Sequence, residues 1–202
     1  MKKIYNMKHI IVIRMRFKDK ELFKKYLSVS KEILAPCLKS QTNKNFEIAL
    51  LIFKDDEDFV KEYLDIDFVG FQNPADFYEY SINENFNIQT RHDMDDYMSP
   101  DYVEKIQEEY DKNIKIYDNF LVQSQPVKMI YQTKEETKMG KYHDRRNSMF
   151  LSLCQKYVTN HIFERQHGFM YEITDNIISL PEGYTKWVIH GENISVKKNM
   201  VK

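Results

Sequence analysis

Short apolar runs rich in β-branched residues alternate with segments of helical period along residues 9–114, and this alternation limits the possible folds more than any other feature of the chain. His9–Phe17 and Phe46–Phe53 indicate strands buried on both faces. Between them, Asp19–Leu38 repeats apolar residues at helical spacing. This order favours right-handed crossovers and a parallel sheet covered on both faces. We therefore expect an α/β fold with a mostly parallel, mixed sheet flanked by helices.

The other expected elements continue this order and become less regular after residue 114. We expect helices at Glu57–Leu64 and Ala75–Phe86 and strands at Asp67–Phe71, Asn87–Thr90, Phe120–Ser124, Val127–Thr133 and Thr185–His190, whereas Ser148–Leu153 fits either type. Ser99 is expected to be the N-cap of a helix that begins at Pro100 and continues to Ile114. The late elements should complete a mixed sheet and close over a site at its edge.

Composition predicts one domain and gives no support for some partners. The 202 residues are enough for one substantial core, and no linker or repeat divides them. The 30 Lys and Arg residues balance the 31 Asp and Glu residues, so nothing in the global charge argues for nucleic acid or an anionic membrane as a partner, and a peripheral membrane contact is left open. Cys37 and Cys154 lie far apart in apolar surroundings, as expected for buried thiols of a cytoplasmic protein. The apolar run Ile10–Ile13 is too short for a signal peptide or a transmembrane segment.

Three carboxylates, Asp93, Asp95 and Asp96, crowd into four positions just after the strand expected at Asn87–Thr90. Ligands of parallel sheets bind beyond the carboxyl ends of the strands, where this acidic turn and a second one, K-D-D-E-D at 54–58, both fall. Like charges at this spacing repel unless water, a proton or a cation relieves them. The cluster therefore indicates a site for Mg²⁺ or Mn²⁺ with a diphosphate, or else a solvated turn before a helix.

Three blocks of the sequence resemble GT-A-fold glycosyltransferases, in particular the rhamnosyltransferase family. The first is R-M-R-F (14–17) with L-K-S-Q-T-N-K-N-F-E-I-A-L-L-I (38–52), the second is T-R-H-D-M-D-D-Y (90–97), and the third joins N-S-M-F-L-S-L (147–153) to W-V-I-H-G-E-N-I-S (187–195). The second block is similar to the family's T-R-x-D-x-D-D version of the D-x-D motif. The resemblance implies one GT-A-like domain over 1–202, with a nucleotide-binding half at 9–114 and an acceptor-side half at 115–202.

The resemblance also implies a metal-dependent glycosyltransferase of the hexosyltransferase class. Such an enzyme moves a sugar from a UDP- or dTDP-sugar to a hydroxyl of a glycan or another acceptor. Asp95 would be the main ligand of Mn²⁺ or Mg²⁺, and Asp93 and Asp96 would share the contacts to the ion and the ribose. His190 matches the position of a further metal ligand, although a histidine on a buried strand is as often a core residue. His92 stands where we would expect an apolar residue.

On the nucleotide side, the residues implied to bind base and ribose follow the first two strands: Arg14, Arg16, Phe17, and Asp55 or Asp56. Arg91 would pair with the diphosphate or with a neighbouring aspartate. Gly191 would let the backbone approach the diphosphate closely. Lys197 and Lys198 either bind phosphate or belong to a solvated end of the chain.

On the acceptor side, an enzyme that inverts configuration needs a carboxylate base, and Asp144 is the candidate because it precedes F-L-S-L. A surface ion pair is an equal explanation for Asp144, and Glu172 and Asp175 are rivals for the base. Trp187 would shape the acceptor site or pack in the core. Two other functions stay open, a sugar nucleotidyltransferase and a non-catalytic nucleotide-sugar-binding domain. The nucleotidyltransferase usually has a glycine-rich loop after its first strand, which R-M-R-F-K-D-K lacks.

Overall fold

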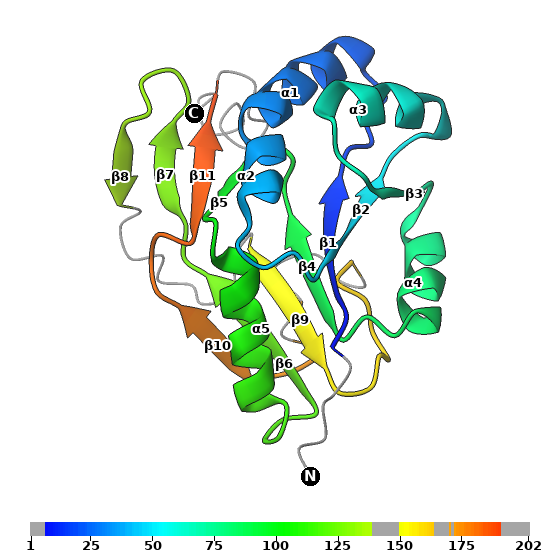
Figure 1. The fold of residues 1–202 in the computed structure, drawn as a ribbon, viewed down its shortest axis with the longest axis vertical. Helices are drawn as coiled ribbons and strands as arrows, with labels where there is room; N and C mark the ends of the chain where they lie inside the picture. The colour runs from blue at the N-terminus through cyan, green and yellow to red at the C-terminus, as the bar shows by residue number, and fades with distance from the viewer. Residues whose placement is uncertain (1–6, 139–149, 164–169, 171, 191–202) are drawn as a thin grey trace.

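The computed structural model describes residues 7–138, 150–163, 170 and 172–190, which form two β-sheets, five α-helices and one 3-10 helix (Figure 1). The helices are α1 (Lys20–Glu32), α2 (Leu34–Ser40), η1 (Lys54–Asp56), α3 (Glu57–Leu64), α4 (Pro74–Asn83) and α5 (Tyr102–Asn113). The strands are β1 (His9–Arg14), β2 (Glu47–Leu51), β3 (Val69–Phe71), β4 (Ile88–His92), β5 (Tyr97–Met98), β6 (Asn119–Ser124), β7 (Val127–Ile130), β8 (Glu136–Lys138), β9 (Leu151–Gln155), β10 (Ile177–Leu180) and β11 (Thr185–Ile189).

The larger sheet has seven strands in the order β10-β6-β9-β4-β1-β2-β3. β1 pairs in parallel with β2 and β4, and β3 and β10 pair in parallel with their neighbours at the two ends. β9 runs antiparallel to both β4 and β6, so its arrow points the opposite way in Figure 1. The prediction of a mostly parallel, mixed sheet flanked by helices is confirmed.

Both faces of this sheet are covered, because alternate residues of its strands enter opposite cores. Ile11 and Ile13 of β1 pack with α1, α2, α3 and α5, on the side that we call the α1 face. Ile10 and Val12 pack with α4 and with Ile162, on the side that we call the α4 face. The central strands are therefore shielded from solvent on both faces.

The smaller sheet brings the late part of the chain back to the turn after β4. Its order is β5-β11-β7-β8, and β5 follows the acidic turn directly. β11 pairs antiparallel with β5, through Met98 and Thr185, and parallel with β7. The residues at the end of β11 consequently lie against residues 93–96, far from them in the sequence.

The helix expected at Asp19–Leu38 is divided into α1 and α2, so the expectation of one continuous stripe is wrong there. Ile33 between them has φ −112° and ψ −65°. Pro36 lies in the first turn of α2, where the missing amide hydrogen of proline is tolerated, but proline would break the interior of one long helix. Asp19 caps α1 by accepting from the Glu21 and Leu22 amides.

The expectation that Ser99 caps the helix after the acidic turn is also wrong. α5 begins at Tyr102, and the Ser99 hydroxyl donates to Asp101 instead. Gln41, from the loop after α2, does the capping. Its amide nitrogen donates to the Ser99 carbonyl (2.8 Å), and its amide oxygen accepts from the Val103 amide (3.0 Å). A side chain from a distant part of the sequence thus replaces the local cap. Gln41, in the first sequence block, therefore has a structural role.

Among the described residues, none of the helices combines the length and the apolar composition that a membrane crossing requires.

Candidate functional site

The acidic turn lies at the carboxyl end of β4, where the ends of β1 and β2 also lie (Figure 1). Helix α1 holds the backbone of the turn, because the Ser30 hydroxyl lies 2.7 Å from the Met94 carbonyl oxygen and can donate to it. The same hydroxyl lies 2.9 Å from the Tyr26 carbonyl of its own helix. Ser30 is fully buried, so the turn is fixed from inside the protein.

The structure brings Asp95 and His190 together. Asp95 Oδ2 and His190 Nε2 are 2.8 Å apart, and the two residues are only 8% and 6% exposed. They are 95 positions apart in the sequence, and the pairing of β11 with β5 is what makes them neighbours. A carboxylate and an imidazole in this arrangement can share a proton or bind the same cation.

Two tyrosines fix the His190 ring. Tyr26 of α1 meets it edge-on at 5.0 Å between ring centroids, and Tyr131, just after β7, does so at 6.4 Å. Glu32 accepts a hydrogen bond from the Tyr131 hydroxyl, and burial together with this bond raises the pKa of Tyr131 to about 12. Sequence analysis did not identify Tyr26, Ser30 or Tyr131. The four-residue spacing of Tyr26 and Ser30 on one buried helix face was the available signal.

Asp96 joins the turn to the smaller sheet. Its Oδ1 accepts a hydrogen bond from the Val188 amide of β11 (2.9 Å), and the residue is 2% exposed. Burial raises the pKa of Asp96 well above its usual range, and the neighbouring Asp95 and Asp93 raise it further, while the Val188 amide opposes the rise. The side chain therefore has a clear positional role.

Asp93 lies in a different electrostatic setting, with Arg91 and Arg14 nearby. Burial raises the pKa of Asp93 to about 6; Arg91 and Arg14 oppose this rise and Asp95 adds to it. Burial lowers the pKa of Arg91, which the charge of Asp93 partly restores. The Arg91 guanidinium lies over the Phe163 ring at 5.0 Å, and its Nε has no hydrogen-bond partner among the described residues.

His92, the last residue of β4, has a buried imidazole. Within the described part of the chain, neither ring nitrogen has a partner. The ring lies beside Phe150, with centroids 5.6 Å apart. Burial lowers the pKa of His92 to about 3, so the imidazole is neutral at physiological pH.

The residues expected on the nucleotide side lie around the ends of β1 and β2. Phe17 packs on Tyr26 (5.1 Å between centroids), which in turn contacts His190. Arg16 lies over the Phe53 ring at 4.6 Å. The two aspartates of η1 have different surroundings. Asp56 forms an ion pair with Lys20 (2.6 Å), whereas Asp55 is exposed.

The structure gives only part of the expected acceptor side. Asp144, Gly191 and Lys197 lie outside the described residues. Asp175 lies between Thr174 and Asn176, which both donate to the carbonyl of Asn119 at the amino-terminal end of β6. The acidic turn is at the opposite edge of the sheet, so Asp175 is poorly placed as a base.

Trp187 of β11 is half-buried and does not share a strand face with His190. Val188 and His190 are both buried, and alternation along the strand directs the side chain of Trp187 to the other side. Trp187 is therefore separated from the contact between Asp95 and His190.

Asp95 and His190 could hold a cation only if a substrate or water supplied most of its ligands. In the described residues, no group of three or more His, Cys, Asp and Glu side chains could hold a metal ion by itself. The contact between Asp95 and His190 supplies two donor atoms at 2.8 Å. Ligands at right angles on an ion with bonds of about 2.1 Å lie about 3 Å apart, so this distance fits neighbouring positions of one coordination shell.

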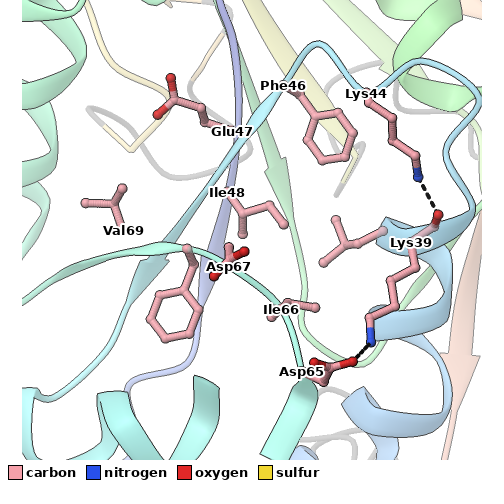
Figure 2. Close-up of a pocket in the computed structure, with 11 residues that line it drawn as sticks. Lys39, Lys44, Phe46, Glu47, Ile48, Asp65, Ile66, Asp67 and Val69 are labelled. Carbon is pink, nitrogen blue, oxygen red and sulfur yellow. Dashed lines mark hydrogen bonds and ion pairs between the residues drawn. The ribbon is translucent and has the colours of Figure 1, made fainter. Parts of the chain in front are cut away.

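A pocket of about 450 Å³ lies elsewhere, between the end of α2 and the amino-terminal parts of β2 and β3 (Figure 2). Phe46 and Ile48 line it, and Lys39 and Asp65 form an ion pair at its rim (2.5 Å). The acidic turn is at the other end of the parallel strands. The pocket therefore has no part in the site described above.

Comparisons with known proteins show a shared fold. Neither a protein-family model nor a curated protein sequence matches the chain. The crystal structure of S. aureus TarS 1–349 in complex with UDP is 11% identical, with a TM-score of 0.51 over 91% of this chain and 61% of that chain. The structure of TarS 1–349 in complex with UDP-GlcNAc is also 11% identical, with a TM-score of 0.51 over 91% and 59%. The chain thus spans about 60% of the length of these structures.

A 4-diphosphocytidyl-2C-methyl-D-erythritol synthase from Anaerococcus prevotii is 14% identical over 96% of this chain and 99% of that chain. At a TM-score of 0.47, this similarity does not establish a shared architecture. The topology and the TarS structures together give the chain a GT-A-like α/β fold.

Proposed function

We propose that the chain is a metal-dependent glycosyltransferase, which moves a sugar from a UDP- or dTDP-sugar to an acceptor hydroxyl. The contact of 2.8 Å between Asp95 and His190, at the carboxyl edge of the sheet, carries the proposal. Parallel sheets bind ligands at this edge. The fold supports the choice of donor, because the TarS structures that share it include complexes with UDP and UDP-GlcNAc.

Asp95 and His190 would hold Mn²⁺ or Mg²⁺ together with the donor's diphosphate. A hard cation with one or two protein ligands usually completes its shell with phosphate oxygens and water. The ion supplies Lewis-acid stabilisation of the negative charge that develops on the leaving diphosphate. Tyr26 and Tyr131 orient the His190 ring for this contact, and Ser30 keeps the turn in place.

The other two carboxylates of the turn have supporting parts in this proposal. Asp96 fixes β11, and with it His190, through the Val188 amide. Asp93 would contact the ribose of the donor. Burial next to Asp95 disfavours the ionised forms of Asp93 and Asp96, so an arriving cation would relieve charge repulsion in the turn.

The nucleotide would lie along the ends of β1 and β2. Phe17 and Arg16 lie where a base and ribose would be adjacent to His190, because Phe17 reaches His190 through Tyr26. We assign Asp55 and Asp56 to the same subsite, and Gly191 and Lys197 to the diphosphate. Asp144 stays our candidate for the base if the enzyme inverts configuration, and the resemblance of the sequence blocks to the rhamnosyltransferase family belongs to the same proposal.

Calorimetric titration with UDP and dTDP, with and without Mn²⁺, tests the proposal first. We expect Mn²⁺ to tighten binding of one nucleotide by about tenfold or more, a gain of about 1.4 kcal/mol or more. Asp95→Asn and His190→Gln should lose this gain and most of the turnover. Asp111→Asn, which changes an exposed carboxylate of α5, is the matched control and should keep both.

Assays of chemistry then separate the possible functions. A glycosyltransferase transfers sugar from the nucleotide sugar to an acceptor or to water, whereas a nucleotidyltransferase forms nucleotide sugar and pyrophosphate from a nucleoside triphosphate and a sugar phosphate. Binding without either reaction would indicate a binding domain. If no nucleoside diphosphate binds with Mn²⁺, or if Asp95→Asn turns over like the wild type, the proposed function is wrong.

A further inference from the structure

Arg14 and Arg91 lie on the same face of the large sheet, at the edge that carries the acidic turn. Arg91 is in register with Val12 on the neighbouring strand, and Arg14 is two residues after Val12. Val12 belongs to the α4 face, and Leu151, which is in register with Arg91 on β9, does too. Strand alternation therefore places both arginines on the α4 face. Their charges also act on one another and on Asp93.

Neither guanidinium has a carboxylate at ion-pair distance within the described residues. Arg14 is exposed. Arg91 is half-buried over Phe163, and its Nε donor has no acceptor among the residues that the structure describes. Removing a guanidinium from water without hydrogen bonds is costly, so proteins usually pair such a group or leave it for a ligand. With Asp93 ionised, the three side chains have a net charge of +1, from two positive charges and one negative charge.

The cluster of Arg14, Arg91 and Asp93 is separate from the contact between Asp95 and His190. His190 packs on Tyr26 and lies two residues after Val188, and both Tyr26 and Val188 belong to the core of the α1 face. Met94, between Asp93 and Asp95, is buried in that same core. The turn therefore divides its carboxylates, with Asp93 beside the arginines and Asp95 beside His190. A diphosphate held at Asp95 and His190 leaves the net positive charge of Arg14, Arg91 and Asp93 uncompensated.

We propose that Arg14 and Arg91 form a second anion-binding site, which takes a phosphate or carboxylate group other than the diphosphate of the donor. The planar guanidinium donates parallel hydrogen bonds to either group. Which molecule carries this anion rests on the proposed function. In a glycosyltransferase, the anion is a charged group of the acceptor or a carboxylate on the transferred sugar. The anion site itself does not depend on that function.

Titration with inorganic phosphate tests the site, with the side-chain Nε–Hε NMR signals of arginine as the readout. We expect phosphate to shift the Arg91 signal, both alone and with UDP and Mn²⁺ at saturation. Arg14→Gln, at an exposed position, and Arg91→Met, which keeps an apolar contact with Phe163, should each weaken phosphate binding about tenfold. Lys112→Met removes an exposed cation of α5 as the matched control and should leave it unchanged.

Three results would overturn the site: no shift of the Arg91 signal, wild-type phosphate affinity in both arginine variants, or full displacement of phosphate by UDP with Mn²⁺. The last result would assign the arginines to the diphosphate instead. If UDP does not bind but phosphate shifts Arg91, the proposed function fails and the anion site stands.

Two further comparisons distinguish the sources of the anion. If the anion belongs to the donor sugar, UDP-glucuronate should bind about tenfold more tightly than UDP-glucose, and Arg14→Gln should abolish the difference. If it belongs to the acceptor, the two donors should bind alike, and phosphate should compete with the acceptor but not with the donor.

Discussion

His92 offers a sharp test of the physical description of the site, because it is a buried polar residue whose removal should stabilise the protein. Its two ring nitrogens have no partner among the described residues, and the side chain is 1% exposed. An unsatisfied buried polar group costs about 1–3 kcal/mol. Leucine has a similar size and no polar atoms. His92→Leu should therefore raise the free energy of unfolding by about 1–3 kcal/mol, less any cost of repacking beside Phe150.

His9 gives a matched contrast in the same sheet. It is as buried as His92, but its Nε2 lies 2.7 Å from the Thr90 hydroxyl and its Nδ1 lies 3.3 Å from the Gln107 amide nitrogen. His9→Leu removes the bond that each partner makes to the ring, while Thr90 keeps its bond with Ser152 and Gln107 keeps its bond to the Asn45 carbonyl. The loss of two buried hydrogen bonds should lower the free energy of unfolding by about 1–3 kcal/mol. The two substitutions are chemically identical, so opposite signs would come chiefly from the difference in hydrogen bonding.

Urea denaturation at pH 7, followed by circular dichroism, measures both changes. The midpoint should rise for His92→Leu and fall for His9→Leu, with the dependence on urea unchanged. If His92→Leu lowers stability by more than about 1 kcal/mol, the ring nitrogens of His92 are satisfied in solution and our description of the strand end is wrong.

Two other predictions concern the buried groups of the site and the core. Asp96→Asn keeps the acceptor of the Val188 amide and should change stability by less than about 1 kcal/mol, whereas Asp96→Ala should cost about 1–3 kcal/mol; equal losses in thermal unfolding would contradict the positional role of Asp96. Burial lowers the pKa of His9 from 6.5 to about 3, so the folded state resists protonation. Between these two pKa values the unfolded state binds a proton that the folded state does not. The free energy of unfolding is therefore unaffected by the protonation of His9 above pH 6.5 and falls by about 1.4 kcal/mol per pH unit as the pH is lowered toward 3. Urea titrations between pH 6 and pH 4 should show a smaller slope for His9→Leu than for the wild type, and an unchanged slope would contradict this assignment.

Local patterns predicted most of the elements between residues 9 and 114. The helix at Glu57–Leu64 has the predicted bounds, and β1 and β2 lie within the predicted apolar runs. These elements depend on hydrophobic period and on short-range signals. Such local signals could not predict that β9 lies antiparallel between β4 and β6. The order of strands in a sheet is set by contacts between distant segments. The short strands β5, β8 and β10 were missed for the same reason.

The site shows the same division between local and long-range information. The acidic turn was identified from its crowded carboxylates and its place after a predicted strand, and His190 was identified by resemblance. The structure places Asp95 and His190 in contact. The residues that hold them, Tyr26, Ser30 and Tyr131, act across elements that no local pattern connects. The helix cap supplied by Gln41 instead of Ser99 is a further example. Roles that depend on bound ligands, including those of Asp93, Arg14 and Arg91, stay predictions.

The central claim is that Asp95 and His190 bind one divalent cation together with a nucleoside diphosphate. Pulsed electron paramagnetic resonance of Mn²⁺ with UDP or dTDP tests it most directly, because a nitrogen bound to the metal modulates the Mn²⁺ signal. We predict nitrogen coupling in the wild-type ternary complex and its loss in His190→Gln. A ternary complex whose Mn²⁺ shows no bound nitrogen, or one whose nitrogen signal persists in His190→Gln, would contradict the claim.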